Sequence, residues 1–167
     1  MKLKISSLLT FSALTAAAFF MTISCKKSNS STSGGSLSAT ISGSAWTTTV
    51  PTQTTFDHVS GVFDIGGGSI KSGDTTTLGV IIGTPFPLHT VINSDTGNID
   101  IVYANFHTQA GYDGGQQAGH SLVTVSSWDS VNHKIAGTFT GVLYNISGGT
   151  DSLVVTNGAF NTSYTVQ

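Results

Sequence analysis

The fold is decided by the stretch KIAGTFTGVLYN, residues 134–145, whose side chains alternate between two faces. The odd-numbered positions share one face and are apolar or glycine: Ile135, Gly137, Phe139, Gly141 and Leu143. The even-numbered positions share the other face: Ala136, Thr138, Thr140, Val142 and Tyr144. A period of two residues, with many β-branched and aromatic side chains, is typical of a strand with one buried face.

The neighbouring segments extend this strand into a meander. Residues 128–134, with the sequence WDSVNHK, have the composition of a hairpin loop, and residues 145–150 have that of a turn. Asn157-Gly158 interrupts the last apolar stretch. Both residues accept a positive φ, so this dipeptide forms either a tight turn or a bulge. We therefore expect an antiparallel meander at the C-terminal end of the chain.

The rest of the chain from residue 37 has a similar organisation, with short apolar stretches separated by Gly, Asn, Asp and Ser. No window sustains the spacing of an amphipathic helix. Residues 94–97 are expected to close another hairpin, and the glycines at 66–68 to form a bulge or turn. We expect strands near 37–42, 46–50, 57–65, 76–82, 89–93, 98–106, 120–128, 134–145, 151–156 and 158–166. The prediction is a single all-β domain, an antiparallel β-sandwich or flattened barrel of about nine or ten strands.

The composition excludes several classes of protein. Only 8% of the 167 residues are charged, compared with about 25% in an average soluble domain. There is no basic face, which excludes a nucleic-acid partner. A hydrophobic content of 38% excludes a charged, disordered chain. The domain holds Lys71 and Lys134 against eight Asp, while Ser and Thr supply 48 residues of the chain, so hydroxyl groups must keep its outer faces soluble.

The N-terminal segment has the pattern of an export signal. Two early lysines precede a mostly apolar stretch at 8–23 that is slightly short for a membrane span. The only cysteine, Cys25, follows directly, and the sequence TISC at 22–25 resembles a bacterial lipobox. We expect residues 1–24 to be a lipoprotein signal peptide and Cys25 to carry the lipid. The alternative is an ordinary signal peptide with an incidental thiol.

Processing at Cys25 would leave a tethered domain. Residues 25–36 are rich in Ser and Gly and predict a flexible, lipid-anchored linker, with the all-β domain at 37–167. Lys26 favours the outer membrane over retention at an inner membrane. No acidic run follows Cys25, which favours the periplasmic face over the cell surface. The membrane is then reached through the N-terminal lipid.

Several segments resemble a family of uncharacterised small lipoproteins of Bacteroidetes that carry a domain of unknown function. They are ISGSAW at 41–46, WDSVNHKIAGTF at 128–139 and VVTNGAF at 154–160, together with SCKK at 24–27. The resemblance covers most of the chain and consists of turn and core patterns. It implies the same location and an all-β fold, and it carries over no functional residues.

The segment from 106 to 120 is the candidate ligand-binding loop. It is long by the standards of this chain, and loops at the edge of a β domain often bind ligands. We expect the Tyr112 ring to stack on a neutral sugar, while Asp113, Gln116 and Gln117 bond its hydroxyl groups. The two histidines of the candidate site, His107 and His120, flank these residues.

Other chemistry has weaker signals. The five histidines lack the spacing of a metal motif, and no G-x-S-x-G sequence occurs, so we expect no metal, no cofactor and no catalytic residue. The triplets at 129–131 and 151–153, DSV and DSL, look like the O-glycosylation pattern of Bacteroidetes. This makes Ser130 and Ser152 candidate modification sites.

The expected function is a non-catalytic binding or structural module of the cell envelope. The partners expected are the membrane and a neutral glycan or small ligand, and the sequence predicts no oligomeric state. Two alternatives stay open. One is a lipocalin-like carrier of a small ligand, although the GSAW at 43–46 is one residue longer than the lipocalin G-x-W. The other is a hydrolase that uses a His/Asp site.

Overall fold

A computed structural model of the chain describes residues 35–115, 119–148 and 150–167. The predicted signal peptide, Cys25, nearly all of the linker, and Gln116 and Gln117 lie outside these ranges. The described residues form one compact unit, in which every element is a strand. No helix in the described ranges is long and apolar enough to cross a membrane.

The all-β prediction is confirmed, with twelve strands in place of nine or ten. The strands are β1 (Ser36–Ile41), β2 (Ser44–Thr47), β3 (Gln53–Asp57), β4 (Val62–Lys71), β5 (Asp74–Gly83), β6 (Val91–Asn93), β7 (Ile99–Asn105), β8 (Ala110–Asp113), β9 (His120–Asp129), β10 (Lys134–Asn145), β11 (Ser152–Ser163) and β12 (Thr165–Val166).

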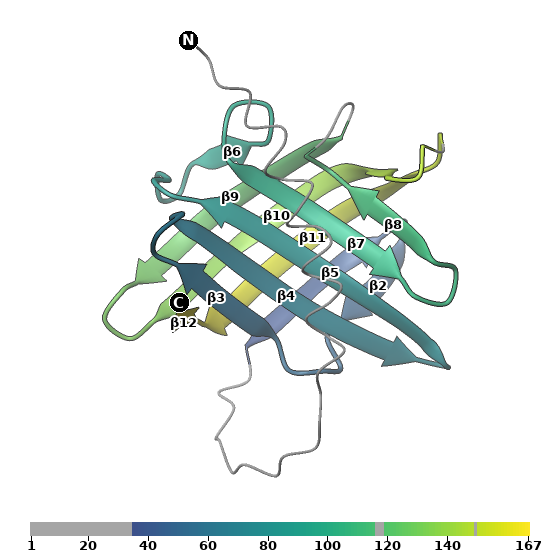
Figure 1. Cartoon of the computed structure of the whole chain (residues 1–167), viewed down its shortest axis with the longest axis horizontal. Coiled ribbons are helices and arrows are strands. Elements are labelled where there is room, and N and C mark those ends of the chain that lie inside the picture. Colours follow the sequence, from purple (N-terminus) through teal and green to yellow (C-terminus); the bar gives the residue numbers. More distant parts are fainter. Residues whose placement is uncertain (1–34, 116–118, 149) are drawn as a thin grey trace. The chain divides into compact units, whose positions relative to one another are not determined.

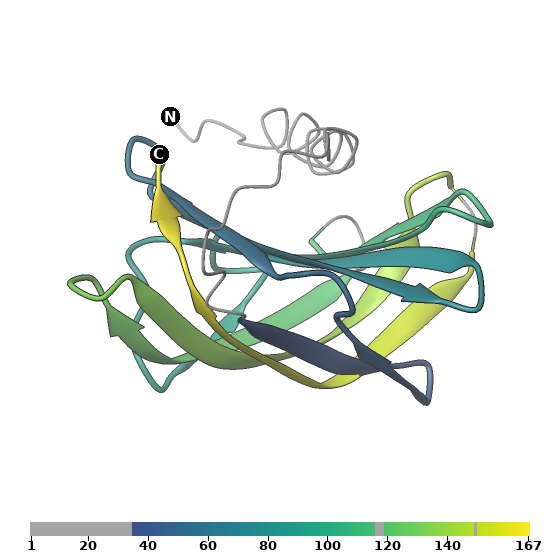
Figure 2. The ribbon, with the colours of Figure 1, turned by 90° about the horizontal axis from the view of Figure 1, so that it is seen from below.

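The strands join into one sheet that is not closed and that folds into two layers (Figures 1 and 2). One layer contains β3, β4, β5 and β7, and the other contains β9, β10, β11 and β1. Strand β8 lies where the layers meet, because it pairs with both β7 and β10. The pairs are antiparallel except for β12, which runs parallel to β3.

The core lies between the two layers and follows from the alternation within each strand. The expected faces of β10 are confirmed, since Ile135, Phe139 and Leu143 are fully buried while Thr138 and Thr140 are exposed. The facing layer contributes side chains that are just as buried: Phe63, Ile65, Leu78, Val80, Ile82 and Ile101. Full burial of one such side chain stabilises the fold by roughly 1.5–3 kcal/mol, so this set supplies most of the driving force.

The expected strand at 57–65 is wrong, because the chain reverses inside it. Asp57 ends β3, and its carboxylate accepts hydrogen bonds from the amides of Val59, at 2.9 Å, and Ser60. Gly61 completes the turn with a φ of 69°. An Asp that bonds its own backbone, followed by a residue with positive φ, forms a turn that separates two strands.

The expected hairpin at 94–97 is half right. A turn does form, with the Asn93 carbonyl accepting from the Gly97 amide at 2.7 Å. The strands on its two sides do not pair with each other, because β6 pairs with β9 and β7 pairs with β5. The turn therefore carries the chain between the two layers.

Two glycine predictions have opposite outcomes. The three glycines at 66–68 lie within β4 and form neither a bulge nor a turn. A methyl group at Gly67 would lie 2.2 Å from Thr48, so the glycine makes room for the segment after β2, where Thr49 donates to the Gly68 carbonyl. Asn157 does form a bulge, with a φ of 52° and a register shift in the β10–β11 pairing.

Candidate functional site

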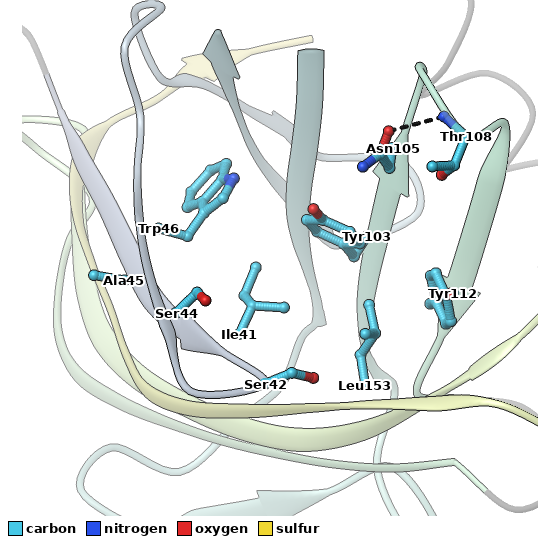
Figure 3. A pocket seen from close by; sticks show the side chains of 10 residues that line it. All are labelled: Ile41, Ser42, Ser44, Ala45, Trp46, Tyr103, Asn105, Thr108, Tyr112 and Leu153. Atoms are coloured by element: carbon cyan, nitrogen blue, oxygen red, sulfur yellow. Dashed lines mark hydrogen bonds between the residues drawn. The ribbon is translucent and has the colours of Figure 1, made fainter. Parts of the chain in front are cut away.

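A pocket of about 390 Å³ opens at one end of the domain, between the β1–β2 hairpin and the β7–β8 hairpin (Figure 3). We call it the aromatic pocket. Its lining consists of Ile41, Ser42, Ser44, Ala45, Trp46, Tyr103, Asn105, Thr108, Tyr112 and Leu153. The volume falls within the range of about 300–1,000 Å³ that small-molecule sites occupy.

The β1–β2 hairpin places Trp46 in this pocket. Ser42 and Gly43 form a two-residue turn, and both have positive φ, as the tightest hairpin turns require. Trp46 is 7% exposed, and its indole N–H donates to the hydroxyl of Thr76 on β5 at 2.8 Å. This bond ties the hairpin of one layer to the other layer and fixes the indole ring.

The β7–β8 hairpin supplies the other two rings. Tyr103 and Tyr112 are directly opposite each other in the β7–β8 pairing, and their ring centres lie 6.3 Å apart. Both rings are half-buried and face the pocket (Figure 3). The Tyr112 hydroxyl donates to the carboxylate of Asp151 at 2.7 Å, which fixes the position of the ring from outside the pocket.

The edge of the pocket is polar. Asn105 accepts hydrogen bonds from the amides of His107 and Thr108, at 3.0 and 3.1 Å, which orders the turn between β7 and β8. The hydroxyl groups of Ser42, Ser44 and Thr108 belong to exposed residues. All ten lining residues are uncharged.

The tyrosines stay neutral at ordinary pH. The hydrogen bond to Asp151 raises the pKa of Tyr112, and it also lowers the pKa of Asp151. Burial raises the pKa of Tyr103, partly offset by a hydrogen bond with Thr76. The pocket therefore offers neutral rings, hydroxyl groups and one amide.

Of the predicted ligand residues, the structure brings Tyr112 into the pocket and places Asp113 elsewhere. The expected loop contains β8, and successive side chains of a strand point to opposite faces. Asp113 is therefore on the outer face, 5% exposed, where it cannot bond a sugar in the pocket. The prediction for Asp113 is corrected for this reason.

The two predicted histidines also lie outside the pocket lining. The Nδ1 atom of His107 is 3.8 Å from Asp74, and that of His120 is 3.5 Å from Asp95. All four side chains are 45% exposed or more. In the described ranges, no group of three or more His, Cys, Asp or Glu is placed to hold a metal ion.

The two candidate modification sites are exposed. Ser130 lies in the β9–β10 turn, whose backbone is held by bonds from the amides of Val131 and Asn132 to the Asp129 carboxylate. Ser152 begins β11, directly before Leu153 of the pocket. Their modification stays a prediction.

Sequence reasoning missed most of the pocket, above all Trp46 and Tyr103. A signal for Tyr103 was present, because it falls on the same face of β7 as the buried Ile99 and Ile101. The closeness of Trp46 to β5 had no local signal, since Thr76 is 30 residues away.

Comparisons of the chain with protein-family models, curated proteins and solved structures gave no match. The resemblance to small lipoproteins of Bacteroidetes therefore stays a prediction, and the candidate function is argued from the pocket.

Proposed function

We propose that the protein is a non-catalytic module of the cell envelope, anchored by a lipid on Cys25, whose β domain binds a neutral glycan in the aromatic pocket. The observation that carries this proposal is the combination of three aromatic rings with an uncharged polar edge. The pocket is lined by Trp46, Tyr103 and Tyr112.

The rings supply surfaces for the apolar faces of sugar rings. Aromatic side chains bury large areas, and their hydrogen-bonding groups find partners when buried. Here Trp46 and Tyr112 use those groups on Thr76 and Asp151, so their ring faces are held in fixed orientations. Fixed rings lose little conformational entropy when a ligand binds, which strengthens binding.

The polar edge supplies the hydrogen bonds that sugar hydroxyl groups need. Ser42, Ser44, Thr108 and Asn105 offer both donors and acceptors. A charged ligand would find no opposite charge among the ten lining residues, whereas a neutral polyol would lose no ion pair on entering. A neutral glycan fits this lining better than a charged metabolite.

The apolar part of the lining supports a second candidate, the lipocalin-like carrier of a small apolar ligand. Ile41, Ala45 and Leu153 lie beside the rings. The two candidates differ at the polar edge of the pocket. A glycan would form hydrogen bonds there, whereas a purely apolar ligand would leave these polar groups without a partner.

The test of glycan binding is a screen of neutral oligosaccharides on an array, followed by titration calorimetry of the best binder. Tyr112→Ala removes one ring from the half-buried wall of the pocket, and we expect it to weaken binding at least about tenfold. The matched control is Phe106→Ala, since Phe106 is 39% exposed, belongs to the same hairpin and does not line the pocket.

Two results would contradict the proposal for the pocket. One is glycan binding that Tyr112→Ala leaves unchanged. The other is an absence of glycan binding together with tight binding of an apolar fluorescent dye, which would establish the carrier instead.

The anchor has a separate test. Labelling with radioactive palmitate should mark the wild-type chain and leave Cys25→Ala unlabelled. Equal labelling of both would refute the lipid anchor. We propose the periplasmic face of the outer membrane as its location. Lys26 directly after Cys25 favours the outer membrane, and the lack of an acidic run after Cys25 favours the periplasmic face.

A further inference from the structure

Two buried carboxyl groups lie on the outer face of the strands that carry the pocket tyrosines. Asp100 on β7 and Asp113 on β8 are each 5% exposed. Asp113 is paired with Val102, two residues from Asp100, so both side chains are on the same face of the sheet. The pairing makes Asp100 and Asp113 diagonal neighbours across β7 and β8, and the charge of Asp113 raises the pKa of Asp100.

Such an arrangement favours a proton on one of the two groups. Two carboxylates cannot both be ionised at close range without strong repulsion, and burial makes that repulsion stronger. A proton on Asp100 removes this repulsion. Burial, followed by the charge of Asp113, raises the pKa of Asp100 to about 8.

The pair has little space in which to rearrange. A methyl group added at Gly115 would lie 2.8 Å from the Asp100 carboxyl carbon, so the backbone there covers the pair closely. The Asp113 carboxylate accepts a hydrogen bond from the Gly115 amide at 2.7 Å. The Oδ1 atom of Asp100 is buried without a hydrogen-bond partner. An ionised Asp100 would therefore be poorly solvated, which favours its protonated form.

The neighbouring strands add no cation beside the pair. On β5, Ile81 is opposite Asp100. The titratable groups on the other strands around the pair are the exposed Asp64 on β4, Tyr144 opposite Asp113 on β10, and His120 on β9 in contact with Asp95. Lys71 and Lys134 are placed at the β4–β5 and β9–β10 turns, opposite Asp74 and Asp129.

The same two strands connect the pair to the aromatic pocket. β7 carries both Asp100 and Tyr103, and β8 carries Asp113 directly after Tyr112. β8 has only four residues, and just two of them pair with β10. Repulsion between Asp100 and Asp113 therefore acts on a short strand. The opposite face of this strand carries the Tyr112 ring of the pocket.

We propose that the Asp100–Asp113 pair is a proton-dependent switch, which holds β8 in place while Asp100 carries a proton and loosens β8 when Asp100 ionises. Loosening β8 displaces Tyr112 and weakens glycan binding, and this second consequence rests on the proposed function. Ligand affinity then falls as the pH rises through the ionisation of the pair.

Hydrogen exchange tests the switch without any ligand. The full chain in detergent micelles is compared at about pH 6 and about pH 9, with exchange rates corrected for the intrinsic effect of pH. We expect protection of the amides at 110–113 to fall at least about tenfold at the higher pH. Asp100→Asn, which keeps a donor and cannot ionise, should show no such fall. The matched control, Asp95→Asn, removes an exposed carboxylate next to His120 and should behave like the wild type.

Equal protection of wild-type β8 at both pH values would overturn the switch. Restoration of protection at the higher pH by millimolar calcium would also overturn it, because the pair would then be a cation site. If Asp100→Asn does not fold, carboxyl ¹³C shifts of the wild type give the ionisation of the pair directly. A pair that ionises fully below about pH 5 contradicts the proposal.

Glycan titration on the same samples separates the two proposals. Protection that depends on pH without any glycan binding refutes the proposed function and supports the switch. Binding that requires Tyr112, with exchange independent of pH, refutes the switch and supports the proposed function.

Discussion

The two ends of the β domain both gather aromatic side chains, and they use them differently. Strand β11 runs from one end of the domain to the other, with Leu153 at the pocket and Tyr164 just beyond the opposite end of the strand. Around Tyr164, each ring has other rings as neighbours: Phe56 is 4.4 Å from Phe63, and Trp128 is 5.7 Å from Phe63, between ring centres. We call this the packed end.

At the aromatic pocket, the rings surround about 390 Å³ of space. Aromatic content alone therefore does not distinguish a core from a binding site. At the packed end the rings come from several strands and fill the gap between them. At the pocket, the two tyrosines are neighbours on one hairpin, and Trp46 is bound to Thr76 on β5, so the rings leave space in front of them.

The largest expected effect concerns stability at the packed end. Phe63 is fully buried and stacks on Phe56, so Phe63→Ala should lower the free energy of unfolding by about 3–5 kcal/mol. Tyr103→Ala, at a half-buried ring of the pocket, should cost only about 1–2 kcal/mol. Urea unfolding followed by fluorescence measures both. Equal losses would remove the distinction between the two ends.

The next effect is the pH dependence of stability near the pocket. The pKa of Asp100 is raised to about 8 in the folded chain, so the unfolded chain loses this proton at a lower pH than the folded chain does. Stability should therefore fall as the pH rises from about 4 to about 8 and level off above that. Unfolding in urea at several pH values measures the slope, which Asp100→Asn should flatten. A free energy of unfolding that rises with pH over this range would contradict a proton held on buried Asp100.

A smaller effect compares the two tryptophans. Trp128 donates to the Tyr164 hydroxyl at 3.0 Å, and Trp46 donates to Thr76 at 2.8 Å. Replacing either by Phe keeps a ring and removes the bond, which should cost about 1 kcal/mol in each case. Only Trp46→Phe should also weaken glycan binding in calorimetry. A loss of binding in Trp128→Phe of the same size would place the site elsewhere.

The smallest effect is expected at the exposed bond between Tyr112 and Asp151. Tyr112→Phe keeps the ring, so thermal stability should hardly change and glycan affinity should stay within about threefold. Asp151→Asn removes the carboxylate whose hydrogen bond raises the pKa of Tyr112, so the pKa of Tyr112 should move down toward that of an ordinary tyrosine. Ultraviolet titration of the phenol follows this change, and an unaltered midpoint would exclude the bond in solution.

The sequence predicted local features well and pairings poorly. The faces of β10 followed from alternation alone, and the turn at 128–134 followed from its composition. The partner of β6 could not be predicted, because turn residues show that the chain reverses and not which strand it meets next. The same holds for the glycines of β4, whose reason is the approach of Thr48 from a distant segment.

The candidate site was predicted only in part for a related reason. The sequence indicates Tyr112 as an aromatic residue in a loop, whereas its segment is a strand. The alternation of a strand then divides Tyr112 from Asp113, so one residue joins the pocket and the next joins Asp100. Strand β8 could not be recognised from the sequence, because its four residues contain only two alternations and the surrounding polar residues have no regular spacing.

The open sheet has one more consequence, which concerns self-association. An exposed edge of an open sheet offers unpaired amides and carbonyls to other copies of the chain. Here β12 runs along β3, and the amide of Gln167 donates to the Phe56 carbonyl, so that edge is covered by the chain itself. Of the other ends of the sheet, β2 is four residues long and leads into a segment bonded to Gly68, and β6 has only three residues. Short and covered edges therefore limit strand-to-strand association between copies of the domain.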